Sequence, residues 1–270
     1  MEYDETVVEG GIDTASNTGK NTPIRGNGTA TDFATRILEW PKLTLRPDAC
    51  AIIPAYNEAA TIGSVILRTR QYIGAVFVVD DCSTDDTAEI ARLAGARVIS
   101  HSKNGGPGVT LQSGYEAAIA SGFKYVVQID GDGQHNPDYI PQMFEAINGC
   151  SMVIGSRFLN KSHHDYPFIR RLGITFFSRV VNLLTHARVT DVTSGYRLIS
   201  VDALTELNRI QSRHWAIAQT IEMSKKGFQM KEISVEMPVR GNGKSQFSGV
   251  VYGLYPIRMI PVIFKAYFSR

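Results

Sequence analysis

The chain reads Val126-Val127-Gln128-Ile129-Asp130-Gly131-Asp132-Gly133-Gln134-His135 near its middle, and this stretch decides the fold. Its mostly apolar beginning predicts a buried strand. Two carboxylates, Asp130 and Asp132, follow at the end of the strand, and the amide of Gln134 comes two residues later. Such oxygen ligands suit a hard cation, Mg²⁺ or Mn²⁺, that takes further oxygens from phosphate, and Gly131 lets the backbone pass close to a ligand. The alternative interpretation is a strand followed by an Asx turn.

Apolar runs and helical segments alternate around this stretch. Strands are expected at residues 50–54, 76–79, 97–99, 126–129 and 152–155. Helical segments separate them, one opening at 57–61, one reaching from 83 to about 94, and one at 110–121. This alternation predicts an α/β fold with a mostly parallel central sheet and helices on both faces. Ligands of such sheets bind beyond the carboxyl ends of the strands, where Tyr56, Asp81, Asn104 and Asp130 fall.

The composition fits one catalytic domain. The 270 residues are 43% hydrophobic and 20% charged, which is typical of a globular chain. The three cysteines follow neither a metal nor a redox spacing and indicate a reducing compartment. Residues 1–47 are expected to be a disordered or linker N-terminus, with no apolar core of the kind a signal peptide needs.

Charge is distributed unevenly along the chain. Residues 1–150 hold 11 Lys and Arg against 19 Asp and Glu, a net charge of −8, and residues 151–270 hold 17 against 7, a net charge of +10. The acidic half suits a metal, and the basic half suits phosphate or an anionic membrane surface. The basic residues are scattered rather than gathered in a tail or helix, so no nucleic acid is expected. The loop at 104–108 lacks the Gly-Lys-Ser/Thr of a P-loop, which disfavours an ATP or dinucleotide site.

Four motifs occur in order along the first half of the chain. They are Pro54-Ala55-Tyr56-Asn57-Glu58, Val79-Asp80-Asp81-Cys82-Ser83-Thr84-Asp85-Asp86-Thr87, Asp130-Gly131-Asp132-Gly133-Gln134-His135 and Gly155-Ser156-Arg157. Together they resemble the family 2 glycosyltransferases, which have the Rossmann-like GT-A fold. Further along, Arg171-x6-Ser178-x3-Asn182 and Asp191-Val192-Thr193-Ser194-Gly195-Tyr196-Arg197 resemble the dolichol-phosphate mannose synthase-like enzymes. The resemblance covers residues 48–250, and it implies a nucleotide-sugar half at 48–158 and an acceptor half at 159–250.

The resemblance implies a donor site in the first half. Tyr56 would stack on the nucleotide base, Glu58 and Asp81 would accept hydrogen bonds from base or ribose, and Pro54 and Val79 would line the pocket. The nucleotide-sugar-binding set it implies is Pro54, Tyr56, Glu58, Val79, Asp81, Asp130, Gly131, Asp132 and Arg157. The metal ligands would be Asp130, Asp132 and Gln134, holding the Mg²⁺ or Mn²⁺ that neutralises the diphosphate leaving group.

The resemblance also implies a catalytic set of Asp132, Arg157 and Asp191. Arg157 would contact phosphate, for which a guanidinium fork is suited. Asp191 would act as the general base for a hydroxyl acceptor, or would orient Arg197. A lipid phosphate acceptor is already anionic and needs no base.

The implied acceptor and phosphate-binding positions are Ser178, Arg197, Arg240, Lys244 and Gln246. The family's late motif has a lysine where this chain has Gln246, with Lys244 two residues earlier. This departure leaves open which residue supplies the charge there.

Two apolar segments lie in the second half. Residues 168–184 predict an amphipathic helix whose apolar face, with Ile169, Leu172, Phe176, Val180 and Leu183, packs in the core. Residues 251–270 form an amphipathic C-terminal segment that Pro256 and Pro261 are expected to break. It predicts an interfacial membrane segment with aromatic anchors, or alternatively a terminal helix packed on the core.

The resulting prediction is an inverting, metal-dependent glycosyltransferase, peripheral at the cytoplasmic face of a membrane. It would move one sugar from a nucleotide-diphosphate sugar (GDP-mannose, UDP-glucose or UDP-GlcNAc) to a polyprenyl or dolichyl phosphate, and a separate membrane protein would supply any flipping or anchoring. One alternative is transfer to a sugar hydroxyl in cell-surface polysaccharide synthesis, with Asp191 as base. Another is an inactive nucleotide-sugar-binding or scaffold protein.

Overall fold

The computed structural model describes residues 45–159, 168–185, 187–210, 214–238 and 249–268, with the backbone alone for 168–170 and 249–258. Residues 43–270 form one compact unit, which is the part of the chain considered below. The expected N-terminal linker lies almost wholly outside the described residues. Three of the expected phosphate-binding residues, Arg240, Lys244 and Gln246, also lie outside them.

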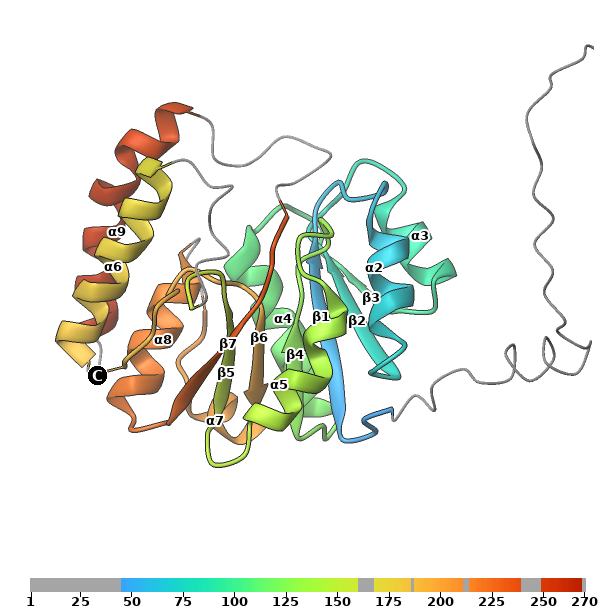
Figure 1. Cartoon of the computed structure of the whole chain (residues 1–270). Helices are drawn as coiled ribbons and strands as arrows, with labels where there is room; N and C mark the ends of the chain where they lie inside the picture. Colours follow the sequence, from blue (N-terminus) through green and yellow to red (C-terminus); the bar gives the residue numbers. More distant parts are fainter. Residues whose placement is uncertain (1–44, 160–167, 186, 211–213, 239–248, 269–270) are drawn as a thin grey trace, which may run out of the picture. The chain divides into compact units, whose positions relative to one another are not determined.

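A seven-stranded sheet forms the centre of the unit (Figure 1). Its strands are β1 (Ala49–Ala55), β2 (Ala75–Asp80), β3 (Arg97–Ser100), β4 (Tyr125–Gln128), β5 (Met152–Ser156), β6 (Arg197–Ser200) and β7 (Met230–Ser234). The order across the sheet is β3-β2-β1-β4-β6-β5-β7. All neighbouring pairs are parallel except those of β6, which runs antiparallel to both β4 and β5.

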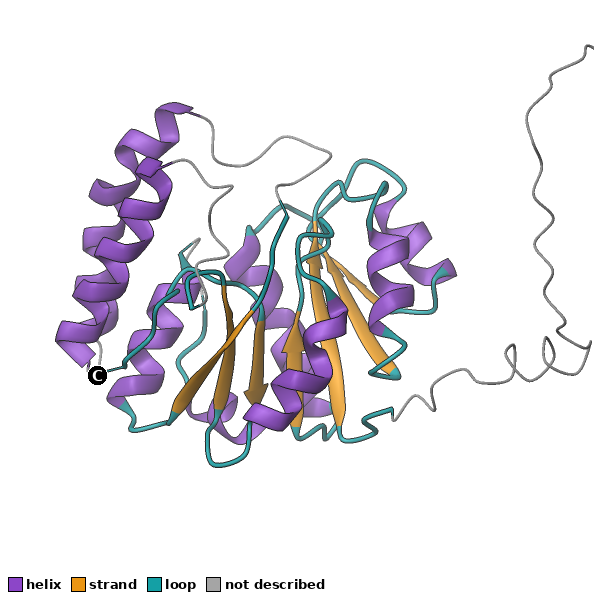
Figure 2. Cartoon of the chain, viewed as in Figure 1, coloured by secondary structure: helices purple, strands orange, loops and turns teal. Residues whose placement is uncertain are grey.

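Helices cover both faces of the sheet (Figure 2). One face carries α2 (Ile62–Thr69), α3 (Thr87–Leu93), the 3-10 turn η1 (Pro137–Tyr139) and α5 (Ile140–Ala146). The other carries α4 (Pro107–Ala120), α6 (Phe168–Thr185), α7 (Val201–Glu206), α8 (Trp215–Lys225) and α9 (Gly249–Phe268). Alternate residues of β1 enter opposite cores, Cys50 and Ile52 on one side and Ala51 and Ile53 on the other. Burial on both sides is why this strand is apolar throughout.

The predicted α/β architecture is confirmed. All five predicted strands are present with small changes at their ends, and helices cover both faces. The sequence analysis did not identify β6, β7, α5, α7 or α8. The residues leading into β6 look turn-like, and the strand itself spans only Arg197–Ser200.

The predicted buried face of α6 is wrong for three of its five residues; of the other two, Val180 packs partly buried against the core and Ile169 is described in its backbone alone. Leu172, Phe176 and Leu183 are exposed, whereas Ile174 and Phe177, with Val181, are buried in the core. The helix is apolar on more than one side, so helical periodicity alone could not decide which side packs inward.

The C-terminal segment forms a continuous helix, contrary to the expected break at its prolines. It runs through Pro256 and Pro261, and Pro261 lies on the exposed side, where water can replace the missing hydrogen bond. Met259 and Ile263 pack into the core beside α6 and α8. Within the described residues, no helix has the length and apolar character needed to cross a bilayer.

Candidate active site

The chemically informative residues gather at one edge of the sheet. β1, β2, β4 and β5 all run in the same direction, so their carboxyl ends meet at this edge. β6 runs in the opposite direction and therefore begins there. The edge receives Tyr56 after β1, Asp81 after β2, Asp130 after β4 and Arg157 after β5, and the loop at 191–196 leads into β6 from the same side.

Asp130, Asp132 and Gln134 form an oxygen-rich turn after β4. The Asp130 side chain is 42% exposed, and Asp132 is partly exposed. Asp132 Oδ1 accepts a hydrogen bond from the Gln134 backbone N at 3.0 Å, and Gln134 Nε2 donates to Pro238 O at 2.7 Å. This leaves the Gln134 amide oxygen as its atom for a cation. Among the described residues, no three His, Cys, Asp or Glu side chains are placed to hold a metal by themselves. Two carboxylates and an amide fit a hard cation that also takes phosphate oxygens.

Two glycines let the backbone approach this turn closely. A Cβ on Gly131 would lie 3.3 Å from Pro54 O, and the Gly131 carbonyl accepts a 2.7 Å hydrogen bond from Thr61 Oγ1. A Cβ on Gly195 would lie 3.3 Å from Asp130 Oδ2. The loop at 191–196 therefore comes close to Asp130, an expected metal ligand, at Gly195, where a side chain would be crowded.

The buried His135 ring contacts both the backbone and the side chain of Asp130. Its Nδ1 accepts a hydrogen bond from the Asp130 backbone N at 3.0 Å, so the neutral ring carries its proton on Nε2, which lies 3.7 Å from Asp130 Oδ2. The ring stacks on Tyr196 with centroids 5.0 Å apart. Burial lowers the pKa of His135 to about 4. The sequence analysis gave His135 no role, although it stands in the motif with the two aspartates.

Arg157 and Asp191 form a buried, two-point ion pair. Arg157 Nε donates to Asp191 Oδ2 at 2.7 Å and an Arg157 Nη donates to Oδ1 at 2.9 Å. The same nitrogen also donates to Thr193 Oγ1 at 2.9 Å. Burial by itself would raise the pKa of Asp191, but the charge and hydrogen bonds of Arg157 outweigh it and hold the pKa below its ordinary value. Asp191 thus orients Arg157, where the sequence analysis considered Arg197.

A second carboxylate, the half-buried Glu232 on β7, holds the same loop. It accepts hydrogen bonds from the Thr190 backbone N and hydroxyl, both at 2.8 Å, and from the Asp191 backbone N at 2.9 Å. Burial raises the pKa of Glu232 despite these bonds. The sequence analysis missed Glu232, because nothing in the pattern around β7 marks it.

Ser178 and Arg197 lie in the interior rather than at a phosphate site. Ser178 Oγ donates to Thr190 O at 2.9 Å. Every guanidinium nitrogen of Arg197 donates to a protein acceptor, including Gln219 Oε1 at 2.8 Å and Ala216 O at 2.9 Å. Burial lowers the pKa of Arg197 to about 10. The expectation that these two residues contact an acceptor phosphate is not met in this structure, and both fasten the 190–197 segment to helices instead.

The loop that carries Tyr56 and Glu58 is fastened to the loop after β2. Tyr56 is 42% exposed, as a stacking residue requires, and Asn57 adopts a left-handed φ of 55°. Three successive backbone N–H groups donate to side chains of the neighbouring loop, Asn57 N to Ser83 Oγ, Glu58 N to Thr87 Oγ1 and Ala59 N to an Asp85 oxygen. Asn57 Oδ1 in turn accepts from Thr84 N. The sequence analysis named Ser83 and Thr84 only as members of a motif and gave them no role.

Asp81 organises the glycine-rich loop before α4. Its carboxylate accepts from Gly105 N at 2.9 Å and Gly106 N at 2.7 Å, and His101 Nδ1 lies 2.9 Å from Oδ1. Burial alone would raise the pKa of Asp81, but these partners outweigh it and lower the pKa. Val79, expected to line the nucleotide pocket, is fully buried in the core under α4, so that expectation is not met.

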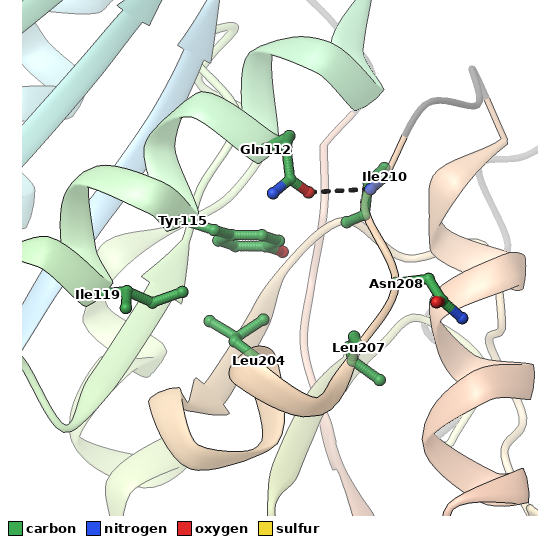
Figure 3. A pocket seen from close by; sticks show the side chains of 7 residues that line it. All are labelled: Gln112, Tyr115, Ile119, Leu204, Leu207, Asn208 and Ile210. Atoms are coloured by element: carbon green, nitrogen blue, oxygen red, sulfur yellow. Dashed lines mark hydrogen bonds between the residues drawn. The ribbon is translucent and has the colours of Figure 1, made fainter.

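A small cavity elsewhere is not this site. It holds about 20 Å³, roughly the room of one water, between α4 and the segment after α7 (Figure 3). Gln112 Oε1 accepts a hydrogen bond from Ile210 N at its rim. Leu204, Leu207 and Ile119 supply apolar walls, and none of the expected site residues lines it.

Comparisons with known proteins agree with this geometry. The chain is 28% identical to an undecaprenyl-phosphate mannosyltransferase of Micrococcus luteus, over 75% of this chain and 88% of that one. It is 32% identical to a UDP-N-acetylglucosamine–dolichyl-phosphate N-acetylglucosaminyltransferase of Methanococcus voltae, over 58% of this chain and 71% of that one. A structure of glucosyl-3-phosphoglycerate synthase from Mycobacterium tuberculosis, with Mn²⁺ and UDP, shares the fold at a TM-score of 0.60 and 20% identity, covering 88% of this chain and 84% of that one.

The family assignment rests on a further match. Residues 50–207, more than half of the chain, match the model of glycosyl transferase family 2. That span contains the strand-end carboxylates, the Arg157–Asp191 pair and β6. The chain therefore belongs to glycosyl transferase family 2 and is a glycosyltransferase with the GT-A fold.

Proposed function

We propose that this enzyme is an inverting, metal-dependent glycosyltransferase that moves one sugar from a nucleotide-diphosphate sugar to a polyprenyl phosphate. It works at the cytoplasmic face of a membrane, to which it binds peripherally. An oxygen of the lipid phosphate attacks the anomeric carbon, the bond from that carbon to the diphosphate breaks, and the nucleoside diphosphate leaves with the bonding electrons.

One observation carries the choice of acceptor. Asp191 is buried, paired at two points with Arg157 and held at a lowered pKa. A carboxylate in this state is a poor proton acceptor, whereas a sugar hydroxyl needs a base to become a nucleophile. A phosphate monoester is already ionised and needs only to be positioned. The arrangement therefore favours the phosphate acceptor.

The named relatives support the same acceptor class. One is a mannosyltransferase that acts on undecaprenyl phosphate and the other an N-acetylglucosaminyltransferase that acts on dolichyl phosphate. They share the lipid phosphate and differ in the sugar. The acceptor proposal thus extends to this chain more readily than any one donor.

The oxygen-rich turn after β4 supports the donor end of the proposal. Asp130, Asp132 and Gln134 would hold Mg²⁺ or Mn²⁺, which supplies positive charge to the departing diphosphate. The exposed ring of Tyr56 offers a face for the base, and Glu58 on the same fastened loop would hydrogen-bond the nucleoside.

Positive groups for the phosphates come from α6 and β5. Arg157 follows β5 and is held in place by Asp191 and Thr193. Arg171 has a buried Nε with no hydrogen-bond partner among the described residues, which makes it a donor suited to an anionic ligand. Arg240 and Lys244 remain predicted contributors outside the described residues.

The test is transfer of labelled sugar from GDP-mannose, UDP-glucose and UDP-GlcNAc to a short polyprenyl phosphate, with Mn²⁺ or Mg²⁺. Label should enter the lipid from one donor and should vanish with Asp132→Ala. Asp138→Asn is the matched control, because Asp138 lies in the next turn and pairs with Arg68 on the surface. Label entering a saccharide hydroxyl instead, with loss on Asp191→Asn, would favour the polysaccharide alternative. Tight donor binding without turnover on any acceptor would favour an inactive binding protein.

A further inference from the structure

Two neighbouring helices leave apolar side chains exposed in regular rows. On α6 the row is Leu172, Phe176 and Leu183, and on α9 it is Ile260, Phe264 and Phe268. Eight large apolar side chains in the described part of the chain are more than half exposed, and these six are among them. The other two, Leu67 and Leu93, stand on α2 and α3 across the sheet. The six residues of α6 and α9 are called the apolar rows below.

Each row has the spacing of one helix side. Residues 172, 176, 179 and 183 are exposed on α6, and residues 260, 264, 265 and 268 are exposed on α9. The opposite sides of the same helices, including Phe177 and Ile263, are buried in the core. The helices contact each other and α8, and they lie at the side of the unit farthest from α2 and α3 (Figure 1). The apolar rows are therefore outward faces of packed helices.

The charge of these helices has one sign. α6 contains Arg170, Arg171 and Arg179, and α9 contains Arg258 and Lys265, while neither helix contains an aspartate or glutamate. Arg179 and Lys265 are exposed within the apolar rows themselves. Exposed aromatic and aliphatic side chains mixed with cations suit the headgroup region of an anionic bilayer.

We propose that the apolar rows of α6 and α9 form a docking face for an anionic phospholipid bilayer. A second copy of the chain is a poorer occupant. A symmetric dimer would place the same rows face to face and bring like charges together, with no acidic residue on either helix to balance them.

Hydrogen bonds connect the docking face to the segment that leads into the loop at 191–196. On the inner side of α6, Asn182 exchanges two 2.9 Å hydrogen bonds with Val189, and Ser178 donates to Thr190 O. These bonds fix the start of the segment that carries Asp191. The helix that rests on lipid thus holds the loop that meets the acceptor. The docking face specifies the peripheral membrane binding stated in the proposed function, and its consequence for the acceptor rests on that function.

The experiment is cosedimentation of the full chain with vesicles of phosphatidylcholine alone or mixed equally with phosphatidylglycerol. We expect binding to the mixed vesicles and a drop of at least tenfold with Phe176→Ser/Phe264→Ser. A similar drop is expected with Arg179→Glu/Lys265→Glu. The matched control is Leu67→Ser/Leu93→Ser, which removes equally exposed side chains from the other face and should bind like the parent. Thermal unfolding establishes that each variant is folded.

Two results would overturn the docking face. One is equal vesicle binding by parent and row variants. The other is a mass of two chains in solution that falls to one in Phe176→Ser/Phe264→Ser, which would make the rows a self-interface. Transfer to a short, water-soluble polyprenyl phosphate reports on the proposed function separately. Failure of that reaction in the parent leaves vesicle binding unaffected, and row variants should retain it.

Discussion

The two sides of the site are built by different means. The donor side holds the Tyr56 loop and the oxygen-rich turn after β4, and the acceptor side holds the Arg157–Asp191 pair and the loop at 191–196. On the donor side, several separate hydrogen bonds fasten the loop of Tyr56, with the backbone N–H groups of residues 57–59 donating to Ser83, Thr87 and the Asp85 carboxylate. On the acceptor side, a buried ion pair of Asp191 with Arg157 does this work, together with the half-buried Glu232 on the backbone of the same loop. A set of separate hydrogen bonds tolerates the loss of one member, whereas a buried ion pair does not. The acceptor side should therefore be the more fragile.

The strongest test of this difference is Asp191→Asn. The change keeps the size of the side chain but leaves the Arg157 charge buried without its partner. Loss of one member of a buried pair costs about 3–5 kcal/mol of folding free energy, and lipid glycosylation should fall at least a hundredfold. Thr193→Val keeps both charges and removes the hydroxyl that accepts from Arg157 and donates to Asp191, so it should cost less, about 1.5–3 kcal/mol. Denaturant unfolding beside transfer assays measures both, and an unchanged stability with lost activity would point to a proton-transfer role instead.

A second test uses pH to probe His135, which lies between the two sides. Its pKa of about 4 in the folded chain is below the ordinary 6.5, so the unfolded chain takes up the proton first as pH falls. Stability should therefore decrease from about pH 6.5 toward pH 4, by roughly 2 kcal/mol between pH 7 and 5 at 1.36 kcal/mol per pKa unit.

The matched variant for this pH test is His135→Asn. It should be less stable than the parent at pH 7 and should lack the part of the slope that His135 contributes in that window. Glu232, whose pKa is raised, contributes a slope of opposite sign in the same pH range, and it does so in both proteins. The lowered pKa values of Asp81 and Asp191 withdraw stability only as pH falls below their ordinary 3.8, so they do not contribute to it. Metal-free denaturant unfolding at a series of pH values gives the slopes, and equal slopes in both proteins would refute the assignment.

A third test changes the contact between the two sides. Gly195→Ala places a Cβ about 3.3 Å from Asp130 Oδ2, so the carboxylate must shift. We expect Mn²⁺ to activate this variant at roughly tenfold higher concentration, a change of about 1.4 kcal/mol. Gly173→Ala on α6 is the control, because its Cβ would meet nothing within 4 Å. It should stabilise the fold by up to about 1 kcal/mol with no change in metal activation. Activation of Gly195→Ala at the same Mn²⁺ concentration as the parent would show that the loop moves and leaves Asp130 in place.

The smallest effect is expected on the donor side. Ser83→Ala removes the acceptor of Asn57 N, a neutral bond worth about 1 kcal/mol. The Michaelis constant for the donor should rise a few-fold while kcat stays the same, since the loop loses one of several anchors. Ser64→Ala on α2, whose hydroxyl donates to Thr61 O, is the control and should leave the constant unchanged. A fall in kcat as large as that expected for Asp191→Asn would show that the donor side is as fragile as the acceptor side.

The donor side was also the more predictable from sequence. Strands buried on both faces are continuous apolar runs, as in Ile52–Ile53 or Val78–Val79, and polar residues directly after them fall at one edge by topology. The metal turn, Tyr56 and Asp81 could be located in this way.

The acceptor side was harder to predict for physical reasons. An arginine beside a turn suggests an exposed cation, yet Arg197 is fully buried. Six neutral acceptors surround it, and four of them come from segments distant in sequence. Adjacent Phe176 and Phe177 gave helix α6 two equally apolar sides, and only the packing of the folded chain chose between them. Glu232 acts through backbone groups 41 and 42 residues away, which no local pattern encodes.

The direction of β6 limits how this enzyme can diversify. Because β6 lies between β4 and β5 and starts at the site edge, the loop at 191–196 is continuous with a strand in the interior of the sheet. An inserted or deleted residue in β6 itself would shift its register against both neighbours, and one in the loop would displace the contacts that Asp191, Thr193 and Gly195 make. Changes of acceptor among related enzymes should therefore come through substitutions in this loop at constant length.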